Sequence, residues 1–173
     1  MQPLVLHPSC DPGPIERVMA EIEATTEGCR ARFRIKGDLP RVILPPQAMA
    51  ARGDGLWRTT CFEIFWQADG ADAYREFNLS PSSKWAAYQF DAHREGGRDA
   101  PVEALAIASS ASDTALSLEC SIAASLSRPA SVALTAVIEN VDGSIQFWAP
   151  SFADGKPDFH SARCRTIRLA DPA

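Results

Sequence analysis

The amino-acid sequence predicts an all-β fold, a jelly-roll-like antiparallel β-sandwich of about nine or ten strands with one short N-terminal helix. Three observations support this fold class. Apolar and polar residues alternate over much of the chain, turn-forming residues recur about every ten positions, and no long helical pattern separates the alternating segments. One domain, residues 1–173, is expected, because the 46% hydrophobic content allows a sizeable core at this length.

The N-terminal region is predicted to hold a short strand at residues 4–6 and a helix at residues 15–24. Apolar residues in the second segment recur at a spacing of about 3.6, which is typical of one helix face. These residues are Ile15, Val18, Met19 and Ile22. Pro14 stands just before them, where the missing N–H of proline costs a helix little.

From residue 29 the period changes to two, which predicts a half-buried strand over residues 29–36. Cysteine, alanine, phenylalanine and isoleucine alternate there with Arg30, Arg32, Arg34 and Lys36. The basic side chains are open to two interpretations, an anion site or a solvated outer face. The second is favoured, because the exposed face of a sheet needs polar residues.

The central region predicts a meander of three strands. They occupy residues 56–66, 71–79 and 85–90, and the connecting segments 67–70 and 80–83 are rich in turn formers. Residues 91–99, which are charged and contain glycine, are predicted to form a loop.

The C-terminal half predicts the remaining strands from apolar runs that alternate with small or polar residues. Their ranges are 102–108, 115–122, 131–139, 145–149 and 163–169. Asp142-Gly143 is a hairpin signal between the third and fourth of these strands.

Composition and charge exclude several classes of function. The net charge is -5 and no run of Lys and Arg occurs, which argues against nucleic-acid binding. No stretch approaches the ~20 apolar residues of a membrane span. The first eight residues lack the pattern of a signal peptide, so a cytoplasmic location is expected. Five cysteines without a CxxC pair predict free thiols rather than disulfides or zinc, and no metal or cofactor is expected.

A candidate ligand face lies on the first two strands of the meander. Strand alternation places Glu63 on one face and Tyr74, Glu76 and Asn78 on one face of the next strand, so a hairpin can bring all four together. Carboxylates and amides hydrogen-bond well to sugar hydroxyls. The alternative is a buried structural network of hydrogen bonds.

Two tryptophans are candidates for stacking against a sugar ring. Trp57 and Trp148 each stand at a strand end beside a loop, and aromatic rings stack on the apolar faces of pyranoses. The alternative is that both rings are part of the core, where tryptophan is usually found.

The loop at residues 155–160 supplies further candidates. Lys156, Asp158 and His160 can line the mouth of a pocket near Trp148, or the last two can fix the loop through backbone hydrogen bonds. Arg94, in the charged loop at residues 91–99, could reach the ligand face, but the interpretation as a solvated loop residue is favoured.

Three segments resemble the DOMON-like family, which is related to the type 9 carbohydrate-binding modules, in a bacterial intracellular branch. They are DGLWRTTCFEIFW (54–66), YREFNLSPSSKWAAYQFDAHREG (74–96) and FWAPSFADGKPDFH (147–160). The resemblance extends roughly over residues 4–169 and implies a β-sandwich with a ligand site on one face or rim and no catalytic machinery. In its sugar-binding members two tryptophans clamp a sugar ring and a glutamate binds its hydroxyls, which implies these roles for Trp57, Trp148 and Glu63.

A non-catalytic module that binds a saccharide or related polyol is therefore the expected function. One alternative is haem binding, through Met49 with His160 or His93, as other DOMON relatives bind haem. Another is an interaction domain for a protein partner, with no small ligand. Glu63 and Glu76 could also be read as a glycosidase-type pair, but the resemblance is not to hydrolases.

Overall fold

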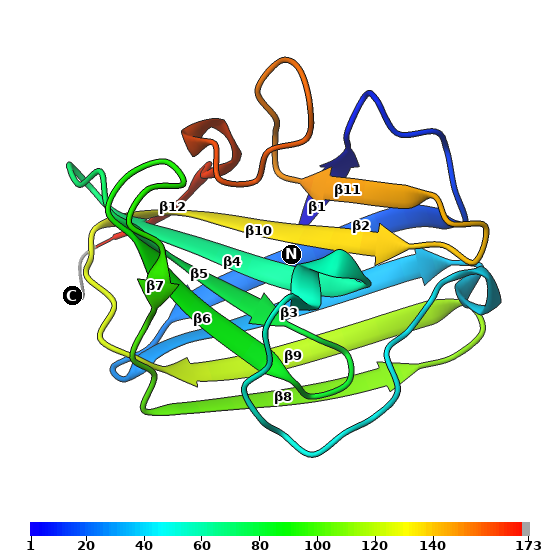
Figure 1. The fold of residues 1–173 in the computed structure, drawn as a ribbon, viewed down its shortest axis with the longest axis horizontal. Coiled ribbons are helices and arrows are strands. Elements are labelled where there is room, and N and C mark those ends of the chain that lie inside the picture. Colours follow the sequence, from blue (N-terminus) through cyan, green and yellow to red (C-terminus); the bar gives the residue numbers. More distant parts are fainter. Residues whose placement is uncertain (171–173) are drawn as a thin grey trace.

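The computed structural model describes residues 1–170; residues 171–173, the end of the expected domain, lie outside the described part. Twelve antiparallel strands form one sheet that curls into a half-barrel (Figure 1). The strands are β1 (Gln2–Leu6), β2 (Ile15–Ala24), β3 (Gly28–Gly37), β4 (Cys61–Ala68), β5 (Tyr74–Leu79), β6 (Trp85–Phe90), β7 (Arg98–Asp99), β8 (Ala104–Ala111), β9 (Ala115–Ala123), β10 (Ala130–Glu139), β11 (Ile145–Ala149) and β12 (Ile167–Leu169).

The order of strands across the sheet is β7-β6-β5-β4-β10-β11-β1-β2-β3-β9-β8, and β12 pairs with β10. Strand β1 joins the two halves, because it pairs with β11 through its last residues and with β2 through its first. The meander expected in the centre of the chain is present as β4, β5 and β6.

The expected helix at residues 15–24 is wrong, since this segment is strand β2. A bulge between Ile15 and Arg17 lets Ile15 and Val18, three residues apart, both face the core, which imitates helical spacing. Beyond the bulge the segment pairs with β3 as far as Ala24. Within residues 1–170 the only helices are three 3-10 turns, η1 (Leu39–Arg41), η2 (Leu56–Arg58) and η3 (Ala162–Cys164), and none is long and apolar enough to cross a membrane.

The expected sandwich of nine or ten strands is also wrong, because the structure has one curled sheet of twelve strands. The two additional strands are β2 and the two-residue β7, which lies inside the segment read as a loop. A sequence pattern cannot mark a strand of two residues, because alternation needs several positions to be visible.

The main core fills the inside of the curled sheet. Phe33 of β3 and Phe62 of β4, both fully buried, pack with ring centroids 4.8 Å apart and connect the two halves. Each fully buried side chain of this size contributes about 1.5–3 kcal/mol. Because this core uses the inner face of β4, β5 and β10, their outer face is left for other contacts.

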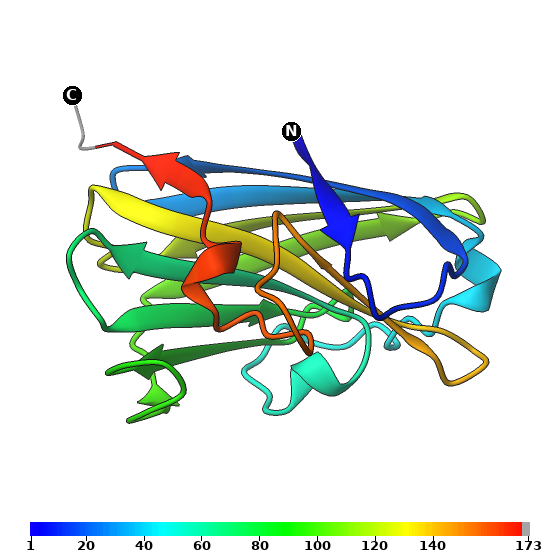
Figure 2. The same ribbon diagram turned by 90° about the horizontal axis from the view of Figure 1, so that it is seen from above.

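A second, smaller apolar cluster covers part of that outer face. Phe65, Val137 and Phe159 belong to it, so the segment between β11 and β12 packs against β4 and β10. Figure 2 shows this segment, coloured orange to red, folded across the yellow strand β10. The cavity described below lies beside this cover.

Candidate functional site

A cavity of about 480 Å³ opens on the outer face of the half-sheet formed by β6, β5, β4, β10 and β11. This volume falls within the roughly 300–1,000 Å³ of small-molecule sites. Its lining consists of Trp57, Glu63, Phe65, Glu76, Tyr88, Phe90, Arg94, Val137, Phe147, Pro157, Phe159 and His160. Strands supply the floor and three loop segments supply the rim.

The polar floor follows from the register of β4 and β5. Glu63 pairs with Asn78 and Phe65 with Glu76, so the two glutamates are diagonal neighbours on the outer face. All of these polar groups are buried. The amide of Asn78 donates a hydrogen bond to Glu76. Thr135 of β10 is the register partner of Glu63, and its hydroxyl donates to Glu63 Oε2 at 3.0 Å.

Burial changes the acidity of both carboxyl groups. It raises the pKa of Glu63 to about 8, and the charge of Glu76 adds to this, while the Thr135 hydrogen bond and Arg94 oppose it. Burial also raises the pKa of Glu76, against the Asn78 hydrogen bond and Arg94. Glu63 is therefore largely protonated at neutral pH and can donate a hydrogen bond as well as accept one.

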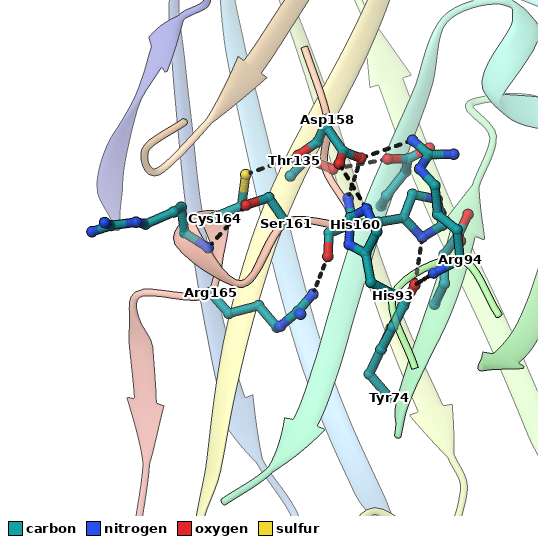
Figure 3. A network of polar contacts seen from close by, with 12 residues as sticks. Tyr74, His93, Arg94, Thr135, Asp158, His160, Ser161, Cys164 and Arg165 are labelled. Atoms are coloured by element: carbon teal, nitrogen blue, oxygen red, sulfur yellow. Dashed lines mark hydrogen bonds and ion pairs between the residues drawn. The ribbon is translucent and has the colours of Figure 1, made fainter. Parts of the chain in front are cut away.

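His160 connects the floor to the rim (Figure 3). Its Nδ1 lies 2.7 Å from the hydroxyl of Tyr74, and the same hydroxyl oxygen accepts the backbone N–H of Arg94 at 3.1 Å. In the tautomer with its proton on Nε2, His160 accepts from Tyr74 at Nδ1 and directs the Nε2–H to Glu76 Oε2, 3.6 Å away. Burial, together with the charge of Arg94, lowers the pKa of His160 to about 4, so the ring is neutral at pH 7.

Asp158 fastens the two loops of the rim together. Its carboxylate accepts hydrogen bonds from the Arg94 guanidinium at 2.8 Å and from the backbone N–H of His160 at 3.1 Å, and His93 Nε2 lies 3.2 Å away. Burial works against its charge, but the hydrogen bond and charge of Arg94 prevail and the pKa of Asp158 is lowered. Asp158 therefore fixes the rim, the second of the two roles considered for it.

Arg165 supports the same rim from behind. Its guanidinium donates to the carbonyl oxygen of His160 at 3.0 Å and lies 4.8 Å from the centre of the Tyr74 ring.

Arg94 holds a left-handed backbone conformation, with φ at 58°, which is uncommon for a residue other than glycine. These contacts make the rim a defined structure rather than a solvated loop.

The structure brings most of the expected site residues together. Trp57, Glu63, Glu76 and His160 line the cavity, whereas Tyr74 and Asn78 lie behind it and hold His160 and Glu76 in place. Lys156 is exposed and does not line the cavity, but its neighbour Pro157 does.

The structure places Trp148 in the main core, away from the cavity. It is 6% exposed, and within residues 1–170 its indole N–H has no partner. Alternation along β11 turns the preceding residue, Phe147, to the outer face instead, opposite Val137. Trp57 is 50% exposed at the rim of the cavity. The cavity therefore has one accessible indole, with Phe147 in place of the expected second tryptophan.

Sequence reasoning found Trp57 but missed the other aromatic walls of the cavity and Arg165, and it favoured a solvated role for Arg94. A signal for two of the walls was present, because Tyr88 pairs with Glu76 and Phe90 with Tyr74, which fixes them on the outer face. Phe159 and Arg94 come from loops, where no period tells which way a side chain points.

The residues considered for haem binding are not gathered here. Met49 is 88% exposed in the loop before η2 and does not line the cavity, and His93 is engaged with Asp158. Within the part of the chain described, no group of three or more His, Cys, Asp or Glu residues is arranged to bind a metal ion.

Fold and cavity together define an all-β protein with a small-molecule-sized site on the outer face of its sheet. No family model and no curated protein matches the sequence. The chain is similar to a crystal structure from Bacteroides uniformis ATCC 8492, described provisionally as a carbohydrate-binding protein, with a TM-score of 0.68 and 18% identity. The match covers 95% of this chain and 83% of that one, so the two share the fold.

Proposed function

We propose that the protein is a non-catalytic module that binds a saccharide or a related polyol in the outer-face cavity. The observation that carries this proposal is the pair of buried carboxyl groups, Glu63 and Glu76, in a cavity whose rim holds the exposed Trp57. A protonated Glu63 can donate a hydrogen bond to a vicinal hydroxyl, and the carboxyl oxygens of both glutamates can accept one. The indole supplies an apolar surface for the ring.

Two further observations support a binding role. The provisional description of the Bacteroides uniformis protein names carbohydrate binding. The resemblance of residues 54–66, 74–96 and 147–160 to DOMON-like domains, related to type 9 carbohydrate-binding modules, favours binding over hydrolysis. Membership of that family and a cytoplasmic location stay predictions.

Trp57→Ala tests the proposal directly. We expect a panel of mono- and disaccharides to raise the melting temperature and change the tryptophan fluorescence of the wild-type protein. Trp57→Ala should weaken binding about fivefold or more, because the ring loses its stacking surface. Met49→Ala, at an exposed residue outside the cavity, is the matched control and should bind as the wild type does.

Two results would overturn the proposal. The first is a full glycan panel that gives no response at millimolar concentration. The second is a sugar response that Trp57→Ala leaves unchanged.

A further inference from the structure

Within residues 1–170, neither carboxyl group of the cavity floor forms an ion pair with a lysine or arginine. In the same part of the chain, Glu63 forms no ion pair, and the basic group beside Glu76 is His160, with its Nε2 3.6 Å away. His160 is neutral at pH 7, as its lowered pKa shows. Arg94 also lines the cavity and its charge favours both carboxylates, but its guanidinium is ion-paired with Asp158 on the rim. Two buried carboxyl groups without an ion pair of their own are costly, so this floor is suited to a positive ligand group.

The walls of the cavity favour the same kind of group. Six of the twelve lining residues are aromatic: Trp57, Phe65, Tyr88, Phe90, Phe147 and Phe159. An organic cation over an aromatic face gains about 0.5–2 kcal/mol, most where water is displaced. A neutral polyol gains stacking from these rings but leaves the acidity of the floor uncompensated.

We infer that the cavity selects a saccharide with a protonated primary amine, an amino sugar, whose ammonium group lies against Glu63 and Glu76. This inference rests on the sugar-binding function proposed above and narrows its ligand class. The ammonium group donates to the oxygen of Glu63 that Thr135 does not use and to Glu76, while the ring packs near Trp57. An N-acetylated sugar carries no charge and lacks this advantage.

Binding of the ammonium group should release a proton from the floor. Four groups act on the Glu63 carboxyl: Glu76 of β5, Arg94 of the loop after β6, Thr135 of β10 and, on its own strand, Cys61. In the free protein, burial and the charge of Glu76 keep Glu63 protonated against the opposing effects of Thr135 and Arg94. An adjacent cation favours the carboxylate, so the O–H bond of Glu63 breaks and the proton passes to the buffer.

Calorimetric titration at pH 6 with glucosamine, glucose and N-acetylglucosamine tests the inference. Glucosamine should bind about tenfold more tightly than the other two, because its hydrogen bonds are charge-assisted. In buffers of different ionisation enthalpy, the heat should reveal release of roughly one proton with glucosamine and none with glucose.

Glu63→Gln is the matched variant, because its amide oxygen still accepts from Thr135. It should remove the proton release and bring glucosamine and glucose within about twofold of each other. Glu16→Gln, on the exposed face of β2, should leave both unchanged. If Glu63→Gln fails to fold, the buffer comparison on the wild type decides the question alone.

The outcomes separate the two proposals. Glucose that binds as tightly as glucosamine, without proton release, overturns the amino-sugar inference and leaves the saccharide-binding function standing. If none of the three sugars binds and the wider panel is also silent, the proposed function fails as well.

Discussion

Burial and the charge of Glu76 hold the carboxyl group of Glu63 protonated at a pH at which water would favour its ionised form. Alternation along β4 and β5 predicted that Glu63 shares a face with Glu76, because the period of a strand is a local property. The raised pKa could not be predicted in this way, since it depends on burial by β10 and by the segment after β11. Thr135, a polar residue in the middle of a mostly apolar strand, is the signal the sequence offered.

Stability against pH should report the state of Glu63. A carboxyl whose pKa is raised in the folded state binds more protons there than in the unfolded chain, so stability falls as pH rises toward about 8. His160, whose pKa is lowered to about 4, acts oppositely but only below its ordinary value near 6.5. The window from pH 6.5 to 8 therefore excludes the histidine and reports on the carboxyl pair of Glu63 and Glu76.

In that window the wild type should lose roughly 2 kcal/mol of unfolding free energy, measured by urea denaturation. Glu63→Gln, which cannot ionise, should lose much less and exceed the wild type in stability at pH 8. Identical slopes for the two proteins would mean that Glu63 is already ionised in the folded state.

Among the elements, the strands with regular alternation were predictable and the irregular ones were not. Residues 29–36 and the meander strands have a period of two, which their pairing confirms from residues 61, 74 and 85 onward. The predicted start of the first meander strand at residue 56 is wrong, because residues 56–58 form the turn η2. The bulge in β2 broke the period and imitated a helix. In β11 the pattern is short, and pairing with β10 and β1 decides that Phe147 rather than Trp148 faces outward.

The two rim loops should depend on one ion pair. Asp158→Asn weakens the contacts to Arg94 and His93, so we expect faster amide hydrogen exchange in residues 91–97 and 155–160. Sugar affinity should fall as the rim loosens. Asp142→Asn, in the hairpin between β10 and β11, should leave the exchange of both loops unchanged. Unaltered exchange in Asp158→Asn would show that Arg165 and Tyr74 alone hold the rim.

In the whole molecule, the curled sheet places the main core on one face and the candidate site on the other. The inner face holds the main core, with Phe33 against Phe62, and the outer face of the same strands holds the cavity. The all-β class was predictable from the sequence, but the closure of the sheet was not, because it rests on long-range pairing through β1. At 18% identity the shared fold with the Bacteroides uniformis protein reflects that arrangement rather than particular side chains.

A crystal structure of the protein soaked with the sugar that gives the largest thermal shift tests the central claim most directly. The account predicts a sugar ring in the outer-face cavity, beside Trp57, with its polar groups bonded to Glu63 and Glu76. A sugar ring bound on another face of the sheet, with this cavity empty, would contradict it.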